Sequence, residues 1–419
     1  MLKKVIILLL FFIASTNVFS TQLLIQMDET QKNHLKAYGI AYWVLERGVE
    51  VKWLLNYRGG SFMMPHDPEI ENECVVRGVS YEVTADAKAN MILDEISSPS
   101  QNMDVIPMQK APKIAVYSPP NKQPWDDAVT MVLTYAEIPY DIIFDEEILD
   151  GKLTNYDWLH LHHEDFTGQF GKFFRNYQHM PWYQEEVKTN RDLAQKLGFL
   201  KVSQMKLVVA KAIKSYVANG GFLFAMCAAT DTYDIALSAE GTDICESMYD
   251  GDPAAPDFNN HLDYTQCFAF QNFTVETDPY KYEFSNIDDT ETRKVDMQSD
   301  YFTLFDFSAK WDPVPTMLCQ NHTRIIKGFM GQTTAFTEKF VKPEVLIMGE
   351  NKAVNEARYI HGEYGNGTWT FYGGHDPEDY RHAVGDPPTD LSLYPNSPGY
   401  RLILNNVLFP AAKKKKQKT

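Results

Sequence analysis

The amino-acid sequence predicts an α/β protein built around a mainly parallel sheet. Apolar segments of strand length alternate with amphipathic segments of helix length in two regions, residues 23–55 and 113–144. In both regions successive strands start about 26 residues apart, the spacing of a βαβ unit. A third observation is a short apolar run at 222–226, which has the length of one buried strand and leads into a helix pattern.

The individual elements are predicted from hydrophobic periodicity and from turn residues. The N-terminal region is expected to hold strands at 23–27, 49–55 and 80–83 and helices at 31–47, 67–76 and 85–96. The second region is expected to hold strands at 113–118, 140–144, 156–161 and 222–226 and helices at 124–136, 203–217 and 232–239. A Gly-Asn-Gly turn at 365–367 joins two late strands, 357–364 and 368–372, into a β-hairpin.

These elements and the changes in composition divide the chain. The predicted parts are a signal peptide at 1–20, a smaller N-terminal α/β domain at 21–97, a linker rich in Ser, Pro and Met at 98–112, a main domain at 113–410 and a basic tail at 411–419. The main domain carries insertions at 166–197 and 240–340. The first insertion is rich in aromatic residues, so it forms either a lid or pocket wall over a site or a separate hydrophobic cluster.

The first twenty residues have the pattern of a secretory signal. A basic start that includes Lys3 and Lys4 precedes an apolar stretch at 5–13, and small residues follow near Ser20. The apolar stretch is too short to span a bilayer, which favours a cleavable signal over a membrane anchor. We therefore expect an exported protein, periplasmic or extracellular, with no transmembrane segment in the mature chain.

Charge and cysteine content limit the partners. The chain has 56 acidic and 39 basic residues, a formal net charge of −17, which argues against a nucleic-acid partner and leaves a small molecule as the expected substrate. The oligomeric state is not indicated. Five cysteines, without a C-x-x-C pair, imply no zinc framework and leave at least one thiol free or paired with another molecule.

Cys227 stands where the strand at 222–226 runs into a helix. A sharp strand-to-helix turn exposes a side chain at the carboxyl edge of a sheet, where the chemistry of α/β proteins is usually located. Backbone N–H groups at the helix start would lower the pKa of a thiol there. The alternative is a buried, inert cysteine on an apolar strand.

A second candidate segment follows the late hairpin and reads Gly374-His375-Asp376-Pro377-Glu378. A histidine at a strand end, with carboxylates one and three residues later, has the composition of a base oriented by an acid. The alternative is a polar loop in which the histidine has no chemical role.

Together these two segments resemble the class I glutamine amidotransferase-like superfamily. The resemblance implies a flavodoxin-like, doubly wound sheet, with Cys227 as the nucleophile and His375 as its base. It also implies that Glu378 or Asp376 orients the histidine, while backbone N–H groups near Ala228 hold the oxyanion. The implied activity is Cys-dependent hydrolysis or acyl transfer at a small amide or related carbonyl.

The chain departs from the family pattern in three places. The strand-to-helix turn at Cys227 lacks the family's usual flanking glycines. One extra residue separates His375 from Glu378, and residues 161–165 replace a Pro-Gly-Gly oxyanion loop. The layout also resembles ThuA-like proteins, a branch without a secure triad, which would make the site a non-catalytic ligand-binding module. The full-length chain resembles exported proteins labelled asparagine synthetase B, although it has no catalytic cysteine after Met1 and no pyrophosphatase-type nucleotide loop.

A dense polar cluster ends the strand at 156–161. His162, His163 and Glu164 are expected to line the substrate site at this strand end, with His160 and Asp165 beside them. Imidazoles and carboxylates so close together also suit a divalent metal ion, although their spacing matches no established metal motif. The prediction is therefore no cofactor, and a metal-dependent hydrolase centred on His162 and His163 is kept as an alternative.

Overall fold

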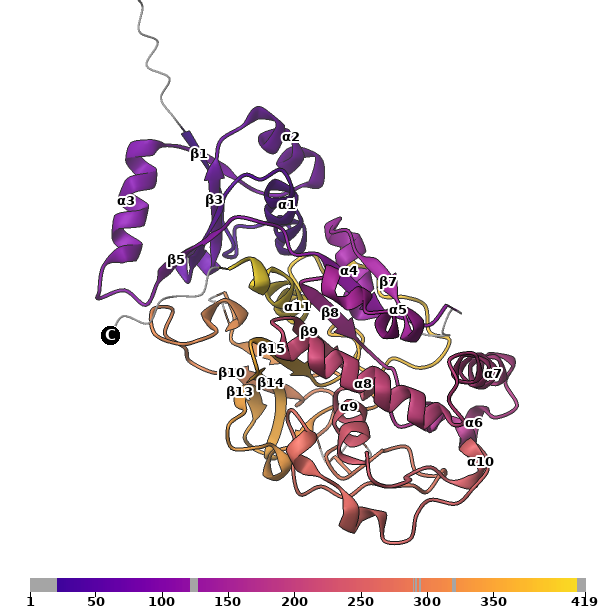
Figure 1. The fold of residues 1–419 in the computed structure, drawn as a ribbon. Coiled ribbons are helices and arrows are strands. Elements are labelled where there is room, and N and C mark those ends of the chain that lie inside the picture. The colour runs from indigo at the N-terminus through magenta and orange to yellow at the C-terminus, as the bar shows by residue number, and fades with distance from the viewer. Residues whose placement is uncertain are drawn as a thin grey trace, which may run out of the picture.

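The computed structural model describes residues 21–120, 127–288, 290, 292–293, 295–318 and 322–412, which form two β-sheets with flanking helices (Figure 1). The predicted signal peptide, the start of the helix predicted at 124–136, Cys319 and residues 413–419 of the basic tail lie outside the described residues. Within the described part of the chain, no helix has the length and apolar character needed to cross a bilayer.

The N-terminal part is a five-stranded sheet in the order β4-β1-β3-β2-β5, in which each pair of neighbours is antiparallel. Its elements are β1 (Thr21–Ile25), α1 (His34–Glu46), β2 (Val51–Leu55), β3 (Ser61–Pro65), α2 (Pro68–Arg77), β4 (Glu82–Ala85), α3 (Asp86–Ser97) and β5 (Asp104–Met108). Strand β3 was not predicted, and it lies between β1 and β2. The segment predicted as a linker contains β5, which pairs with β2, so residues 104–108 belong to this sheet.

The main sheet is larger and mixed. Its strands are β6 (Ile114–Tyr117), β7 (Asp141–Ile143), β8 (Trp158–Leu161), β9 (Phe222–Met226), β10 (Tyr301–Leu304), β11 (Ile325–Lys327), β12 (Phe336–Thr337), β13 (Leu346–Asn351), β14 (Glu356–Tyr364) and β15 (Gly367–Tyr372). The order is β11-β10-β13-β14-β15-β9-β8-β6-β7, with β12 paired to β14.

The prediction of a flavodoxin-like, doubly wound and mainly parallel sheet is wrong for this sheet. The run β7-β6-β8-β9-β15 is parallel, as predicted for its first four strands. Every pair beyond β15, however, is antiparallel. The physical reason is the late hairpin, which the sequence did predict: β14 folds back on β15 and exposes a new edge to which β13, β10 and β11 add.

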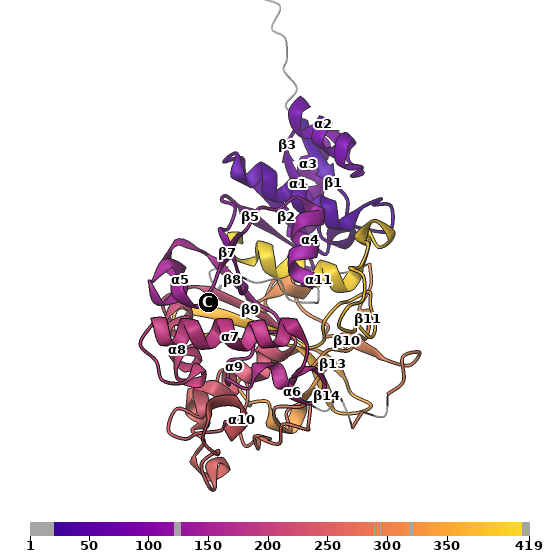
Figure 2. The same ribbon diagram turned by 90° about the vertical axis from the view of Figure 1, so that its right-hand side faces the viewer.

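The helices of the main part are α4 (Ala128–Ala136), α5 (Asp145–Leu149), α6 (Phe174–Tyr177), α7 (Pro181–Lys196), α8 (Val202–Ala218), α9 (Ala228–Ser238), α10 (Ser247–Asp250) and α11 (Pro398–Leu408). Helix α11 contacts both α1 and α4, so the end of the described chain links the N-terminal part to the main sheet (Figure 2).

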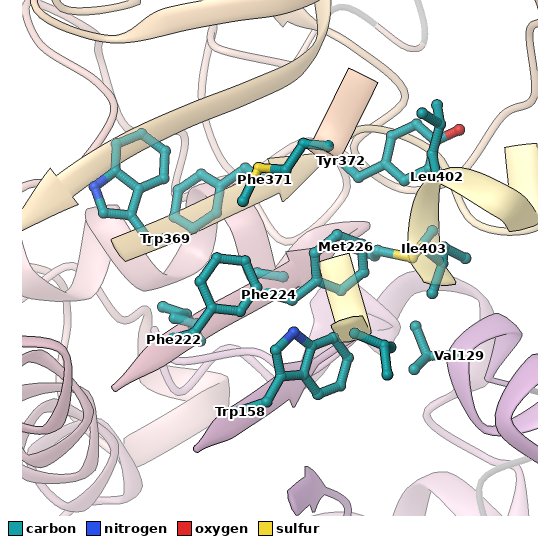
Figure 3. Packing of buried hydrophobic residues seen from close by; sticks show 14 of the residues in the cluster. Val129, Trp158, Phe222, Phe224, Met226, Trp369, Phe371, Tyr372, Leu402 and Ile403 are labelled. Carbon is teal, nitrogen blue, oxygen red and sulfur yellow. The ribbon is translucent and has the colours of Figure 1, made fainter. Parts of the chain in front are cut away.

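The core that positions the candidate site surrounds β9. All five residues of this strand are buried between β8 on one side and β15 on the other. Trp158, Phe224 and Trp369 belong to these three neighbouring strands and lie in one apolar cluster, to which Leu402 and Ile403 of α11 also belong (Figure 3). Strand β9 therefore cannot shift without disturbing close-packed neighbours, which fixes the position of the residue that follows it.

Candidate active site at Cys227

Cys227 forms the whole turn between β9 and α9. Its backbone has φ +51° and ψ −139°, a region that residues other than glycine rarely adopt and that costs free energy. The conformation is held because β9 and α9 are both buried and because Thr230 donates its N–H and hydroxyl to the Cys227 carbonyl, at 3.2 and 2.6 Å. Strained turns of this kind present a nucleophile at the carboxyl edge of a sheet.

The thiol of Cys227 is buried, with 3% of the residue exposed, and it lines a cavity of about 220 Å³. Burial raises the pKa of the thiol to about 11, although N–H groups of Gln332, Ala228 and Thr333 act in the opposite direction. The N–H of Ala228 at the helix start thus acts in the expected direction, but the expectation of a lowered thiol pKa is wrong for the resting site because burial outweighs it. Desolvation dominates because the thiol itself is buried.

The Gly331–Thr334 loop supplies the main-chain contact to sulfur. The N–H of Gln332 donates to Sγ of Cys227 at 3.4 Å, while the Gln332 side chain donates to the Gly171 carbonyl at 2.7 Å. The same loop runs beside the segment that leads to His375: the N–H of Gly374 donates to the Thr333 carbonyl at 2.8 Å. A Cβ on Gly331 would lie 2.9 Å from the backbone nitrogen of His375, so this close approach of the two main chains requires glycine.

His375 is held by another histidine. Its Nδ1 lies 2.9 Å from Nε2 of His162, and Nδ1 of His162 lies 3.3 Å from Oδ1 of Asp127. Burial alone would raise the pKa of Asp127, but His160 and His162 hold it well below its usual value, so Asp127 is ionised. The row Asp127–His162–His375 thus replaces the short histidine–carboxylate pair that the sequence predicted.

The contact between His162 and His375 admits one proton between the two facing nitrogens. In the tautomer with Nδ1–H of His375 as the donor, Nε2 of His162 accepts at 2.9 Å, whereas the 3.3 Å contact of Nδ1 of His162 with Asp127 lacks hydrogen-bond geometry. Nε2 of His375 is left as an acceptor, and it has no hydrogen-bond partner in the described structure. Burial and the neighbouring histidines keep the pKa of His375 well below 6.5, so the ring is neutral near pH 7.

The structure brings Cys227 and His375 to the same cavity, together with His163. In the part of the chain that the structure describes, no hydrogen bond joins the Cys227 thiol to His375. The resting pair is therefore a neutral thiol and a neutral imidazole that share a cavity. Catalytic hydrogen bonds often tighten only when substrate binds.

The two carboxylates predicted to orient His375 have other partners. Asp376 accepts from the N–H of Glu378 at 2.9 Å and from the hydroxyl of Thr389 at 2.7 Å. Burial raises the pKa of Glu378, and a hydrogen bond from Ser397 partly opposes this effect. Asp376 therefore stabilises the turn after His375, the Glu378 side chain bonds to Ser397, and no hydrogen bond joins either carboxylate to the His375 ring in the described structure.

The residues predicted to bind substrate have different positions. His163 lines the cavity, whereas His162 lies behind it and bonds to His375. Glu164 accepts from the N–H of His162 at 2.8 Å, and burial raises its pKa to about 8, so it holds the strand end. Ala228 begins α9 directly after Cys227, so this helix starts four residues earlier than the predicted range 232–239.

Two site residues, Asp127 and Gln332, were missed by the sequence analysis. Asp127 precedes a helix and caps it, accepting from the N–H groups of Val129 and Thr130 at 2.7 and 2.9 Å. Its position after β6, a strand of the parallel run, is a signal that could have found it. Gln332 acts through its backbone N–H, a group that almost every residue has, so its amino-acid type does not predict this role.

The aromatic insertion at 166–197 contributes to the cavity through Phe173, which lines it with Tyr282 of the second insertion. Phe173 also belongs to a buried cluster with Phe170, Tyr183, Cys245 and Tyr249. This insertion therefore forms part of the cavity wall and also part of a hydrophobic cluster, which are the two alternatives that the sequence left open.

Three histidines could also hold a metal ion. One nitrogen from each of His162, His163 and His375 lies within 4.8 Å of the others. Neutral imidazoles at this spacing suit Zn²⁺, which binds histidine nitrogen at about 2.0–2.1 Å.

The alkylation rate of Cys227 should follow its raised pKa. Because only the thiolate reacts, we expect iodoacetamide to modify Cys227 in the folded protein roughly 100-fold more slowly at pH 8 than in the unfolded chain. The folded rate should continue to rise with pH from 7 to 9.5, since the thiol pKa is about 11 instead of 9.0. Peptide mass spectrometry measures this rate, and a plateau below pH 8 would contradict the assignment.

Comparison with known proteins gives weak likenesses. No family model matches the chain, and no curated protein matches it. The cytoplasmic protein STM3548 from Salmonella typhimurium is 12% identical over 72% of this chain and 100% of its own, with a TM-score of 0.34. The GH42 β-galactosidase Gan42B from G. stearothermophilus is 11% identical over 64% of this chain, with a TM-score of 0.28.

A third solved structure, the exo-β-1,4-mannosidase Op5Man5 from Opitutaceae bacterium strain TAV5, is 10% identical over 62% of this chain, with a TM-score of 0.26. This chain spans 28% of Gan42B and 31% of Op5Man5. These likenesses define neither a family nor a shared fold.

Proposed function

We propose that the protein is an exported Cys-dependent hydrolase or amidotransferase-like enzyme that acts on a small amide or related carbonyl, as its resemblance to the class I glutamine amidotransferase-like superfamily implies. The observation that carries the proposal is the backbone of Cys227, an L-residue at φ +51° between a buried strand and a buried helix. Strain of this kind persists where the surrounding structure imposes it, and such positions cluster at active sites.

The cavity beside Cys227 supports the proposal. A larger cavity of about 750 Å³ lies elsewhere, lined by residues that include Tyr216, Phe222 and Phe409. No cysteine or histidine is found among the described residues that line it. The cavity of about 220 Å³ is smaller, but it combines a thiol, imidazoles and a directed backbone N–H group.

In the proposed reaction, Sγ of Cys227 attacks the substrate carbonyl while its proton passes to Nε2 of His375. The charge that His375 gains is shared along the row to His162 and the ionised Asp127. Backbone N–H groups of Ala228 and the Gly331–Thr334 loop would stabilise the oxyanion.

Collapse of the tetrahedral intermediate breaks the bond from carbon to the leaving group. The leaving amine takes the proton from His375, and a thioester remains on Cys227. Water then attacks the thioester carbonyl and gives up a proton to His375, which returns it to sulfur as the carboxylic acid leaves. The raised thiol pKa fits this order of events, because the proton moves when substrate is bound and not before.

A second candidate function is a metal-dependent hydrolase, which the cluster of His162, His163 and His375 favours. In this alternative the histidines would hold a divalent ion, and that ion would supply an activated water. The ion would engage His375 directly, so His375 could not serve as the base for Cys227.

The test is hydrolysis of a panel of small amides and esters, before and after dialysis against EDTA and before and after alkylation of Cys227. We expect at least one member to be hydrolysed, with activity that survives EDTA and disappears on alkylation. Activity that EDTA abolishes and alkylation spares would select the metal-dependent hydrolase. Binding of panel members without any turnover would select the ThuA-like ligand-binding module.

A further inference from the structure

The side chain of Gln332 ties its own loop to two other segments beside the candidate site. It is buried, with 4% of the residue exposed, and it lines the cavity that contains Cys227. Its Nε2 donates to the carbonyl of Gly171 in the first insertion at 2.7 Å and to the carbonyl of Tyr282 in the second at 3.3 Å. Two acceptors match the two N–H groups of this amide, which fixes the orientation of the side chain.

The Gly171 carbonyl is presented by a strained turn, Phe170–Lys172. Phe170, Gly171 and Lys172 have φ values of +48°, +67° and +57°, so three successive residues have the positive φ that favours glycine. Glycine adopts such a backbone without steric cost, whereas Phe170 and Lys172 do not. A turn of this kind persists only where the surrounding structure holds it.

Contacts on two sides hold the Phe170–Lys172 turn. Oδ2 of Asp165 accepts from the N–H of Gly171 at 3.1 Å. Lys172 is buried, and its Nζ donates to the carbonyls of Glu276 and Asp278 at 2.5 and 3.2 Å. The turn is therefore fixed relative to the second insertion, so the Gly171 carbonyl is a firm anchor for Gln332.

The anchored side chain belongs to the residue whose backbone contacts the thiol. The N–H of Gln332 donates to Sγ of Cys227 at 3.4 Å. The next residue is held as well, because the hydroxyl of Thr333 donates to Oδ1 of Asp231 at 2.9 Å. A displacement of the Gln332 side chain would therefore displace a hydrogen-bond donor at the reacting sulfur.

We propose that Gln332 is a positioning residue: its side chain, anchored on the Phe170–Lys172 turn, directs its own backbone N–H toward Sγ of Cys227 and toward the oxyanion that forms there. The inference rests on the proposed function, because the oxyanion belongs to that reaction. Through the Gly171 carbonyl, the aromatic insertion becomes part of the catalytic arrangement. A donor that is held in place before the reaction stabilises a developing oxyanion without having to reorient.

Gln332→Met tests this role, because methionine has nearly the length of glutamine and has no N–H group to donate. We expect iodoacetamide to modify Cys227 about fivefold more slowly at pH 8 than in the natural protein, since loss of the N–H contact raises the thiol pKa further. With a hydrolysed member of the amide panel, kcat should fall about 100-fold while KM changes little, as expected for the loss of one oxyanion donor. Peptide mass spectrometry and steady-state kinetics measure these quantities.

A purely structural role of the side chain predicts the opposite change in alkylation. If Gln332 only supported packing, its replacement would loosen the cavity, admit water and lower the thiol pKa, so Cys227 would react faster. Gln332→Asn is a second variant, in which the amide is one methylene too short to keep the bond to Gly171. It should also slow alkylation, and it decides the question if Gln332→Met does not fold.

Gln31→Met is the matched control for these variants. Gln31 is also buried, and its Nε2 likewise donates to two carbonyls, those of Gln26 and Ser80 at 2.7 and 3.0 Å, but it belongs to the N-terminal part. This variant should lose stability in urea unfolding as Gln332→Met does, yet keep the natural alkylation rate and kcat. Loss of stability alone would then not explain the effect at Cys227.

The outcomes separate the inference from the proposed function. If the natural protein hydrolyses a panel member but Gln332→Met and Gln332→Asn leave alkylation of Cys227 unchanged or faster, the inference is overturned and the proposed function stands. If the natural protein hydrolyses no panel member, the proposed function is overturned. The alkylation rates of the variants then still decide whether Gln332 positions a donor at Cys227.

Discussion

Replacing Cys227 by serine is expected to lower kcat/KM for the hydrolysed amide by at least about 10³-fold, because loss of a nucleophile removes the covalent route. Serine has nearly the volume of cysteine and can accept the same N–H from Gln332. The free energy of unfolding should therefore change by less than about 1 kcal/mol. Steady-state kinetics and urea unfolding measure the two quantities.

Cys245→Ser is the matched control for this substitution. Cys245 is also buried, but it does not line the cavity, and its sulfur donates to the Thr167 carbonyl at 3.1 Å. This variant should keep its turnover, whatever stability it loses. Full activity in Cys227→Ser would show that the thiol is not the nucleophile.

Arg358→Met is expected to destabilise the protein by about 3–5 kcal/mol, the usual cost of breaking a buried ion pair on one side. Arg358 lies on β14 with no exposed surface, and it donates to both oxygens of Asp300 at 2.7 and 2.8 Å. It also donates to the carbonyls of Phe329, which precedes the loop that contacts Cys227, and of Thr334, which ends that loop. The variant should therefore lose activity together with stability.

The cluster of Asp300 with Arg293 and Arg358 is expected to stabilise the protein less as the pH falls. Burial alone would raise the pKa of Asp300, but Arg293 and Arg358 hold it below the usual value of 3.8. A carboxyl whose pKa is lowered by folding stabilises the protein above the pKa of the unfolded chain and loses that contribution as the pH falls. The difference in stability between Arg358→Met and the natural protein should accordingly shrink below about pH 4.

Arg324→Met is the control for Arg358→Met. Arg324 pairs with Asp306, but the two side chains are 53% and 77% exposed. An exposed pair contributes about 0–1 kcal/mol, so this variant should unfold close to the natural midpoint. Equal effects of the two substitutions would contradict the role assigned to the buried cluster.

The parts of the site that the sequence predicted are those built from contiguous residues. The strand, the cysteine and the helix around Cys227 follow one another directly, and the apolar run at 222–226 has no competing interpretation as a loop. The hairpin before His375 was similarly marked by its Gly-Asn-Gly turn. Local patterns of this kind determine local structure, and both features appear where they were expected.

What depends on pairing between distant segments was not predicted. Strands β10 and β11 have four and three residues, and nothing in their sequence shows that they extend the sheet beyond β13. Asp376 and Glu378 have the spacing of a histidine–carboxylate motif, yet Asp376 stabilises a turn and Glu378 bonds to Ser397. Asp127 reads as an ordinary helix cap and becomes part of the site because β6 and β8 are neighbours.

The most direct test of the central claim is mass spectrometry of the acid-quenched reaction with a substrate found in the panel. The account predicts an adduct with the mass of the acyl group on the Cys227 peptide, formed within the first turnover and absent in Cys227→Ser. Ongoing hydrolysis without an adduct on Cys227, even when a slow ester substrate is used to accumulate the intermediate, would contradict the account.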